Sequence, residues 1–334
     1  MKLPSEVVER LRPVYQGRRV CVTGGAGFIG GHLLDALLSL GADIAVIDDL
    51  SNSEADHVAD LIDLEPERIR FMHGSILEDR ALAEAVDESA LVFHLAALGS
   101  VQRSVEEPER TWLVNATGTL RVLEAARSAG AARVVFAASS SAYGDASDMP
   151  LSERAAPRPR SPYAASKLAG EHLCSAWSRT YGMSTVCLRY FNVFGPRQRA
   201  DSPYAAVVAA FARSLLAGEP PIIYGDGNQS RDFTFVGNAV LGTLLAGASD
   251  RALHGEVVNI AAGQRRSVQD LATAMRDLIG GPAPEFRPGR SGDVRDSQAD
   301  ITLANELLAY QPVTPFEEGL TETVRWYREA LAQA

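Results

Sequence analysis

The chain has 334 residues, 46% of them hydrophobic, which is enough for a sizeable core in one large domain or two unequal ones. Its 32 basic and 42 acidic side chains give a net charge of -10, which excludes a broad cationic surface for nucleic acid or an anionic membrane. The composition also excludes fibrous and disordered classes. Three cysteines lie far apart and form no CxxC pair, so a reducing compartment is favoured over a disulfide framework.

The N-terminal segment, residues 1–17, mixes charged residues and prolines with a few apolar ones. It lacks the unbroken apolar stretch of a secretory signal, and no apolar run of the chain reaches membrane-spanning length. We therefore expect a cytoplasmic protein in which residues 1–17 are an extension that forms a short helix ahead of the first strand.

From residue 18 onward, short β-branched or apolar runs alternate with longer stretches of helical period, a pattern typical of a parallel sheet between layers of helices. Helices are predicted at residues 28–40, 81–86, 111–128 and 163–180, most of them ending near a glycine. Strands are predicted at residues 20–23, 44–47, 69–72, 91–94, 134–137, 185–188 and 257–260. After residue 190, prolines and glycines interrupt the pattern, and residues 280–292 are predicted to be a surface loop.

A glycine-rich segment, GGAGFIG at residues 24–30, joins the first predicted strand to the first of these helices. Its GxxGxxG spacing permits a tight turn, close approach of the backbone to a pyrophosphate, and close packing of helix and strand. The second strand ends at Asp48, where a carboxylate can accept hydrogen bonds from an adenosine ribose, and Asp49 can share this role. Because an acid repels a 2'-phosphate, the segment predicts a Rossmann-type site for NAD and not NADP.

Hydroxyl groups follow the fifth predicted strand at residues 139–141, in a position where such sheets bind ligands. The next helix carries Tyr163 and Lys167 four residues apart, hence on one face. A phenol titrates at about 10, and a base acting near neutrality needs a pKa roughly three units lower, which a nearby ammonium favours. We therefore expect Tyr163 to be the base, Lys167 to lower its pKa and bind the cofactor ribose, and Ser139 to hold the substrate hydroxyl.

These motifs resemble the extended short-chain dehydrogenases/reductases of the NAD-dependent nucleotide-sugar epimerase and dehydratase type, over residues 18–327. Other matching segments are HLAA at 94–97, NATGT at 115–119, LRYFNVFGP at 188–196 and RDF at 231–233. The resemblance implies an α/β fold with a doubly wound parallel sheet and two domains. A Rossmann domain is expected at residues 18–190 with a return near 233–260, and a mainly substrate-binding α/β domain at residues 191–334.

The resemblance also implies which residues bind NAD. They are Gly24, Gly27, Phe28, Ile29, Gly30, Asp48, Asp49, Asn52, Ser53, Ser75, Ile76, Leu95, Ala96, Ala97, Asn115, Tyr163, Lys167 and Tyr190. Ser75 stands where the family often has an Asp at the adenine contact, so we expect one weaker hydrogen bond there and no change of cofactor.

The residues after the fifth strand distinguish the reactions of the family. The hexose 4,6-dehydratases carry Thr-Asp-Glu there, and decarboxylating relatives place a Glu where this chain has Ser141, whereas the three positions here are serines. The resemblance therefore implies epimerisation of a UDP-sugar at C4 through a transient 4-keto sugar. NAD is expected to stay tightly bound and to be restored in every turnover.

The substrate is expected to be anchored by the C-terminal part of the chain. The resemblance assigns Asn192, Arg231 and Arg290 to the diphosphate, Asp293 to a ribose hydroxyl and Tyr224 to the uracil, in keeping with the bidentate bonds that arginine forms with phosphate. The other expected substrate residues are Ser139, Ser140, Ser141, Tyr163, Arg199, Ala206, Val207 and Ser297. No metal site is expected.

Two segments point to different sugars. Ser297 stands where epimerases restricted to glucose and galactose resemble one another in having a bulky Tyr, so its small side chain leaves room for a C2 N-acetyl group. This favours the pair UDP-N-acetylglucosamine and UDP-N-acetylgalactosamine, with UDP-glucose and UDP-galactose also open. The segment GPRQRAD at residues 195–201 instead resembles UDP-uronic acid 4-epimerases, in which Arg197 or Arg199 would face a C6 carboxylate.

Remoter alternatives are a nucleotide-sugar dehydratase, a reductase with net redox change, and a non-catalytic NAD-binding protein. The last is disfavoured because Ser139, Tyr163 and Lys167 are all present. Relatives commonly pair through helices corresponding to residues 111–128 and 163–180, so the resemblance implies a homodimer.

Overall fold

A single parallel sheet forms the centre of the protein. The structure is a computed structural model, and it describes residues 3–146, 148–200, 206–289 and 294–333. The sheet has seven strands in the order β11-β6-β5-β4-β1-β2-β3. Their bounds are β1 Arg19–Thr23, β2 Asp43–Asp48, β3 Ile69–His73, β4 Leu91–His94, β5 Arg133–Ser139, β6 Ser184–Tyr190 and β11 His254–Ile260. All seven predicted strands are in this sheet, which confirms the doubly wound α/β fold.

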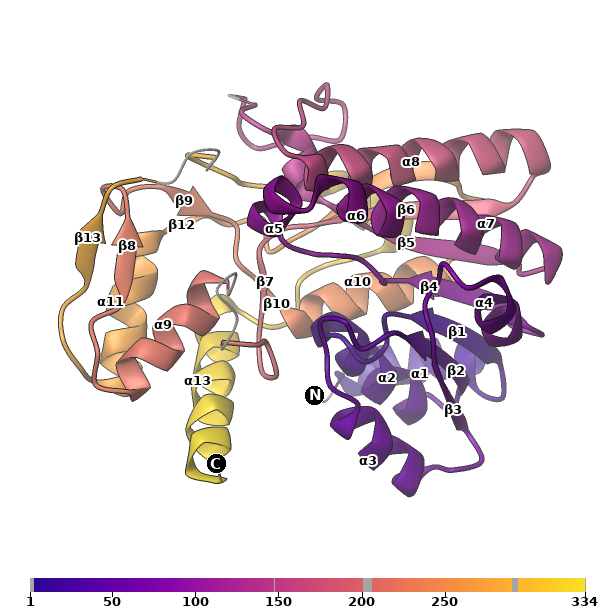
Figure 1. Ribbon diagram of the computed structural model, residues 1–334, viewed down its shortest axis with the longest axis horizontal. Coiled ribbons are helices and arrows are strands. Elements are labelled where there is room, and N and C mark those ends of the chain that lie inside the picture. The colour runs from indigo at the N-terminus through magenta and orange to yellow at the C-terminus, as the bar shows by residue number, and fades with distance from the viewer. Residues whose placement is uncertain (1–2, 147, 201–205, 290–293, 334) are drawn as a thin grey trace.

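Both faces of the sheet are buried, which explains why its strands are apolar in nearly every position. In β1, Val20 and Val22 belong to one core cluster and Cys21 to the other, since successive side chains point to opposite faces. One face is covered by α2 (Phe28–Ser39) and α10 (Val236–Ala248), and the other by α4 (Asp79–Val86), α7 (Gly118–Ser128) and α8 (Pro162–Tyr181). Figure 1 shows α7 and α8 together at the upper right, with α10 and α2 lower in the view.

The helix predicted at residues 111–128 is interrupted. It consists of α6 (Pro108–Trp112), a π-helical turn (Leu113–Thr117) and α7. The turn places Asn115 so that its side chain accepts from Leu98 N at 2.8 Å and donates to Leu98 O at 3.2 Å. The extra residue of a π turn re-aims one side chain without ending the helix, and such turns are frequent at functional sites. Before residue 190, two further short helices were not predicted, α3 (Asp56–Leu64) and α5 (Val101–Glu106).

The N-terminal helix α1 (Ser5–Tyr15) forms as expected within residues 1–17, and it belongs to the main core. It packs on α10, where the Tyr15 hydroxyl donates to Leu244 O at 2.6 Å. A Cβ at Gly247 would lie 2.5 Å from that hydroxyl, so the close approach of α1 to α10 requires glycine there. The helix therefore closes one end of the core instead of standing apart from it.

The irregular region after residue 190 contains more helix than its prolines and glycines suggest. Three helices, α9 (Val207–Leu216), α11 (Val268–Ile279) and α13 (Phe316–Gln333), lie beside the main sheet in Figure 1, and α12 (Thr302–Leu308) packs on β11 and α10. Three two-stranded sheets accompany them: β7 (Val193–Phe194) with β10 (Thr234–Phe235), β9 (Ser230–Arg231) with β12 (Arg266–Ser267), and β8 (Ile222–Tyr224) with β13 (Glu285–Arg287). Residues 285–287 of the predicted loop are thus strand, and residues 290–292 lie outside the described part.

None of the helices in the described ranges combines the length and the apolar character that crossing a bilayer requires.

Candidate active site

The glycine loop runs from the end of β1 to the start of α2, and its glycines are required by close contacts. Gly24 has φ 74°, and a Cβ there would lie 2.6 Å from Ala96 N. A Cβ at Gly30 would lie 2.2 Å from Gly24 O. The helix begins at Phe28 and Ile29 without a side-chain cap at Gly27, so its first N–H groups have no side-chain acceptor at the cap and are of the kind that binds phosphate. This donor set fits the pyrophosphate of a dinucleotide.

Asp48 connects the glycine loop to the loop after β2. Its carboxylate accepts from Ala26 N at 3.0 Å, from Leu50 N at 2.9 Å and from the Ser53 hydroxyl at 3.1 Å. Burial raises the pKa of this carboxyl, and the three hydrogen bonds, which lower it, offset only part of that rise. Asp49 is exposed and accepts from the backbone N of residue 51. Asp48 therefore lies beside the glycine loop with part of its acceptor capacity used to order the loop after β2, and its contact with a ribose stays a prediction.

The other predicted NAD residues of this half lie at the same edge of the sheet. Leu95, Ala96 and Ala97 follow β4, and Ala96 N donates to the hydroxyl of the last β1 residue at 3.2 Å. Ile76 follows β3 and is buried against α7. The remaining side chains have protein partners: Ser75 with Leu77 N, Asn52 with Arg103, Asn115 with Leu98 and Ser166, and Tyr190 with Thr243. Asn115 and Tyr190 are therefore held by the core.

The structure brings the predicted catalytic hydroxyls together. Ser139 ends β5, and its hydroxyl accepts from Ser141 N at 3.2 Å and from the Ser141 hydroxyl at 2.9 Å. Ser140 follows in the 3-10 turn Ser140–Tyr143. On the facing helix, Ser161 caps the first turn of α8 by accepting from the N of residue 164 at 3.1 Å, which places Tyr163 at the start of the helix. The Ser139 side chain is close enough to Tyr163 to favour the phenolate and so lower the pKa of this phenol.

Lys167 is buried one turn further along α8. Its ammonium donates to Ala137 O at 2.8 Å and lies 5.0 Å from the centre of the Phe136 ring. Burial lowers the pKa of Lys167 to about 8. Burial also raises the pKa of Tyr163, and the Ser139 side chain offsets only part of that effect. The expected fall in the phenol's pKa is therefore not found in this structure, because desolvation of the phenolate outweighs the groups that favour it.

Two predicted substrate residues from distant parts of the chain meet on the other side of the site. The Asn192 amide nitrogen lies 3.3 Å from the Ser297 hydroxyl and donates to Asp232 O at 3.3 Å. Asn192 has φ 32°, an uncommon conformation for a residue other than glycine, and such residues cluster at functional sites. Ser297 is 8% exposed, so a larger side chain at this position would have to displace its neighbours.

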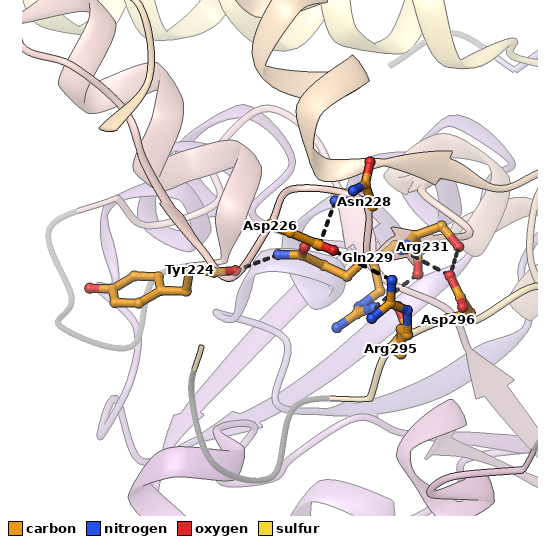
Figure 2. A network of polar contacts seen from close by, with 8 residues as sticks. Tyr224, Asp226, Asn228, Gln229, Arg231, Arg295 and Asp296 are labelled. Atoms are coloured by element: carbon orange, nitrogen blue, oxygen red, sulfur yellow. Dashed lines mark hydrogen bonds and ion pairs between the residues drawn. The ribbon is translucent and has the colours of Figure 1, made fainter. Parts of the chain in front are cut away.

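The predicted nucleotide contacts lie around β8 and β9 (Figure 2). Arg231 donates to Ser230 O at 2.9 Å and to Arg295 O at 3.0 Å, and Arg295 pairs with Asp226 at 3.4 Å. The Tyr224 ring points away from this group, although its backbone oxygen accepts from Gln229 at 2.6 Å. Tyr224 and Arg231 could thus contact different parts of a nucleotide. Ala206 and Val207 begin α9, while Arg290 and Asp293 lie outside the described residues.

The two arginines considered for a uronate both contact elements that follow the glycine loop in the chain, α2 and the loop after β2. Arg197 pairs with Asp35 of α2 at 2.7 Å and also contacts His57 of α3. Against the effect of burial, the hydrogen bond between His57 and Asp35 and the charge of Arg197 hold the pKa of Asp35 below its usual value. Arg199 lies 3.4 Å from Glu54, in the loop after β2, and its side chain is 45% exposed. Arg197 is thus committed to an inter-element contact, and Arg199 is the better placed of the two to reach a ligand.

Sequence reasoning missed Asp232, which is fully buried beside Arg231. Its carboxylate accepts from Ala262 N and from Ala299 N, each at 3.1 Å, so it joins three segments of the C-terminal part. Burial raises its pKa to about 7 despite these hydrogen bonds. Its position within the RDF motif was the available signal. In the described ranges, no group of three or more His, Cys, Asp or Glu side chains is arranged to hold a metal ion.

Comparison with known proteins agrees with this geometry. The model of the NAD dependent epimerase/dehydratase family matches residues 20–261. A UDP-glucose 4-epimerase of Mycolicibacterium smegmatis is 40% identical over 317 residues, which cover 93% of this chain and 98% of that protein.

Two solved structures extend the comparison. A UDP-N-acetylglucosamine 4-epimerase from Methanobrevibacter ruminantium, in complex with UDP-N-acetylmuramic acid, is 36% identical with a TM-score of 0.89, covering 94% of this chain and 99% of that one. A UDP-glucuronic acid 4-epimerase from Bacillus cereus, with NAD, is 31% identical with a TM-score of 0.86, covering 93% and 99%. The family match, its extent and the glycine loop lead to one conclusion: the chain belongs to the NAD dependent epimerase/dehydratase family, whose cofactor is NAD.

Proposed function

We propose that this protein is a UDP-sugar 4-epimerase that interconverts UDP-N-acetylglucosamine and UDP-N-acetylgalactosamine. The observation that carries the proposal is the run of three serines that ends β5 and begins the following turn, which holds no carboxylate and has Tyr163 and Lys167 on the facing helix α8. A dehydration or decarboxylation would need a further acid at this turn. Epimerisation needs only a reversible proton transfer and a reversible hydride transfer.

In the proposed reaction Tyr163 is the base that takes the proton of the sugar 4-hydroxyl, which requires the charge of Lys167 to offset the burial that raises the pKa of this phenol. Ser139 holds the same oxygen through its hydroxyl, and Lys167 supplies the positive charge that favours the phenolate. When bound, NAD supplies the hydride acceptor for C4, and the glycine loop and Asp48 are the proposed means of holding it in place through every turnover. The 4-keto sugar then turns its other face to the site and is reduced with inverted configuration.

The preference for an N-acetylated sugar rests on Ser297. Its small side chain lies 3.3 Å from Asn192, a proposed diphosphate residue, so it is near the proposed sugar-phosphate end of the site. A bulky residue at this position would fill the space that a C2 N-acetyl group needs. The 40% identity with a UDP-glucose 4-epimerase supports UDP-glucose as a further substrate.

A UDP-uronate remains the second candidate because Arg199 is partly exposed and could meet a C6 carboxylate. The commitment of Arg197 to Asp35 counts against a two-arginine carboxylate site.

Incubation of the purified protein with each of three UDP-sugars tests the proposal. We expect UDP-N-acetylglucosamine to give its 4-epimer fastest, UDP-glucose more slowly, and UDP-glucuronate least, as resolved by chromatography. Conversion of UDP-glucuronate alone would replace the proposal by the uronate candidate. Absence of any epimer, or accumulation of a dehydrated or decarboxylated product, would reject 4-epimerase activity.

We further propose that the protein is a homodimer. Apolar side chains are exposed on four neighbouring helices, α5 to α8, which lie together in Figure 1. They are Val105, Trp112, Leu113, Leu120 and Tyr181, exposed by 37% to 66%. A second copy of this chain would bury them, because a patch of this kind on a soluble protein marks an interaction surface. Sedimentation equilibrium should give twice the chain mass, and Trp112→Glu should give the monomer; a monomeric parent protein would reject the proposal.

The three cysteines are free and buried, which supports a reducing compartment such as the cytoplasm as the proposed location.

A further inference from the structure

A buried ion pair lies behind the proposed catalytic residues and has no part in the reaction as proposed above. Arg189 of β6 donates two hydrogen bonds to the carboxylate of Glu171 of α8, at 2.8 and 2.7 Å. The two side chains are 3% and 4% exposed. The guanidinium also faces the ring of Tyr143, 4.4 Å from its centre.

Stability is a poor explanation for this pair. Removing two charges from water is costly, and the attraction between them often only offsets that cost. Among the described residues, one nitrogen of the guanidinium, Arg189 Nη1, has no hydrogen-bond partner although it is buried. An apolar pair of similar size would avoid both costs. A charged pair at this place is better explained by what it does to its neighbours.

The neighbours of the pair are the elements that carry the proposed catalytic residues. Glu171 is four residues after Lys167 on α8, so the two side chains lie on one face of the helix about one turn apart. Tyr143 ends the turn that begins with Ser140, and its hydroxyl donates to Asn259 of β11 at 2.7 Å. The pair therefore connects α8, the serine turn and the strands β6 and β11 at one point.

The charges around Lys167 are few. Cys174 and Glu171 face it from its own helix, and both favour its protonated form against the effect of burial. His94 of β4 is also near, but burial and the ammonium lower the pKa of this imidazole to about 3, so it is neutral. Arg189 of β6 lies on the far side of the Glu171 carboxylate. Among the described residues, Glu171 is therefore the carboxylate that favours the protonated form of the buried lysine.

We propose that Glu171 and Arg189 are positioning residues: the pair holds α8 against the serine turn, and the carboxylate keeps Lys167 protonated. The inference rests on the proposed function, because a charged lysine matters only if Tyr163 acts as a base. It predicts that the pair affects turnover and its pH dependence more than the binding of substrate.

The sequence offers a direct measurement, since the chain contains only two lysines, Lys2 and Lys167. In a Lys2→Arg background, isotopically labelled lysine gives one side-chain NMR signal, whose shift reports the titration of Lys167 in the NAD-loaded protein. Glu171→Gln should lower the midpoint by about one unit, because an opposite charge nearby shifts a pKa by one unit or more. The fall in kcat at high pH should move down with it, while KM changes by less than about threefold.

A second variant keeps the proposal testable if Glu171→Gln fails to fold. Glu171→Gln leaves a buried guanidinium without its partner, a change that often destabilises strongly, whereas Glu171→Gln/Arg189→Gln removes both charges. We expect the double variant to fold and to lower the Lys167 midpoint in the same direction. Glu84→Gln is the matched control, because Glu84 pairs with Arg70 on the surface, and it should leave the midpoint unchanged.

The outcomes separate the two proposals. Midpoints and pH profiles within about 0.2 unit of the parent in both Glu171 variants would overturn the positioning role. A lower kcat together with a higher KM, while the titration midpoint of Lys167 stays unchanged, would also overturn the positioning role, since this would indicate structural damage only. If the parent protein converts no UDP-sugar, the proposed function fails, and the NMR titration still decides whether the pair controls the charge of Lys167.

Discussion

Replacing Gly30 by alanine should cost the protein most of its NAD. The added methyl group would lie 2.2 Å from Gly24 O and 2.8 Å from the Cα of Gly25, and both neighbours are backbone atoms that cannot rotate away. Relief of this overlap needs a shift of about 1 Å in the glycine loop, and overpacking of this kind typically costs about 1–3 kcal/mol. If that cost falls on the NAD-bound conformation of the loop, affinity falls roughly five- to 150-fold.

The next residue provides the control. A methyl group on Gly31 would meet only side chains, with the His57 ring nearest at 3.1 Å, so a small movement of that ring accommodates it. Both substitutions have the same effect on helix propensity. NAD released from the denatured protein, per mole of chain, should fall sharply in Gly30→Ala and stay near the parent value in Gly31→Ala. Equal NAD content in the two variants, with both folded, would refute the assignment of this loop to the cofactor.

Four further predictions concern other parts of the chain. Tyr163→Phe should lower kcat by about 10²- to 10⁴-fold with NAD content unchanged, because the base is lost and the cofactor site is not; near-normal turnover would exclude Tyr163 as the base. Ser297→Tyr should abolish turnover of N-acetylated sugars and spare UDP-glucose, and an equal loss of both would refute the role of this position in specificity. Tyr15→Phe should reduce the free energy of unfolding in urea by about 0.5–1.5 kcal/mol, because the buried hydrogen bond from the Tyr15 hydroxyl to Leu244 O is lost. The kcat of the parent protein should fall as pH rises through about 8, since Lys167 then loses its proton; a constant kcat to pH 10 would contradict a catalytic role for its charge.

The sequence predicted the main sheet well because its strands are buried on both faces. Continuous apolar runs such as residues 134–137 can be recognised without any knowledge of their partners. The glycine loop could also be recognised from the sequence, because the close contacts at Gly24 and Gly30 require glycine at these positions.

The features that the sequence did not predict depend on contacts between segments that are distant in the chain, and no local sequence pattern encodes these contacts. The π turn around Asn115 follows from a hydrogen bond to Leu98, which is distant in sequence, so residues 111–128 read as one helix. After residue 190, the prolines and glycines between the helices interrupted the pattern, so the helices α9 to α13 were not predicted. The pKa of Tyr163 was misjudged because helix spacing shows which residues lie near each other but not how deeply a phenol is buried.

The central claim is that C4 of a UDP-sugar is oxidised and reduced again within one site by NAD that does not leave it. UDP-N-acetylglucosamine carrying deuterium at C4 tests this directly, with the product analysed by NMR and mass spectrometry. The account predicts that UDP-N-acetylgalactosamine forms with the deuterium still at C4 and that no reduced cofactor appears in solution. Loss of the deuterium to solvent during turnover, or a product with unchanged configuration at C4, would contradict it.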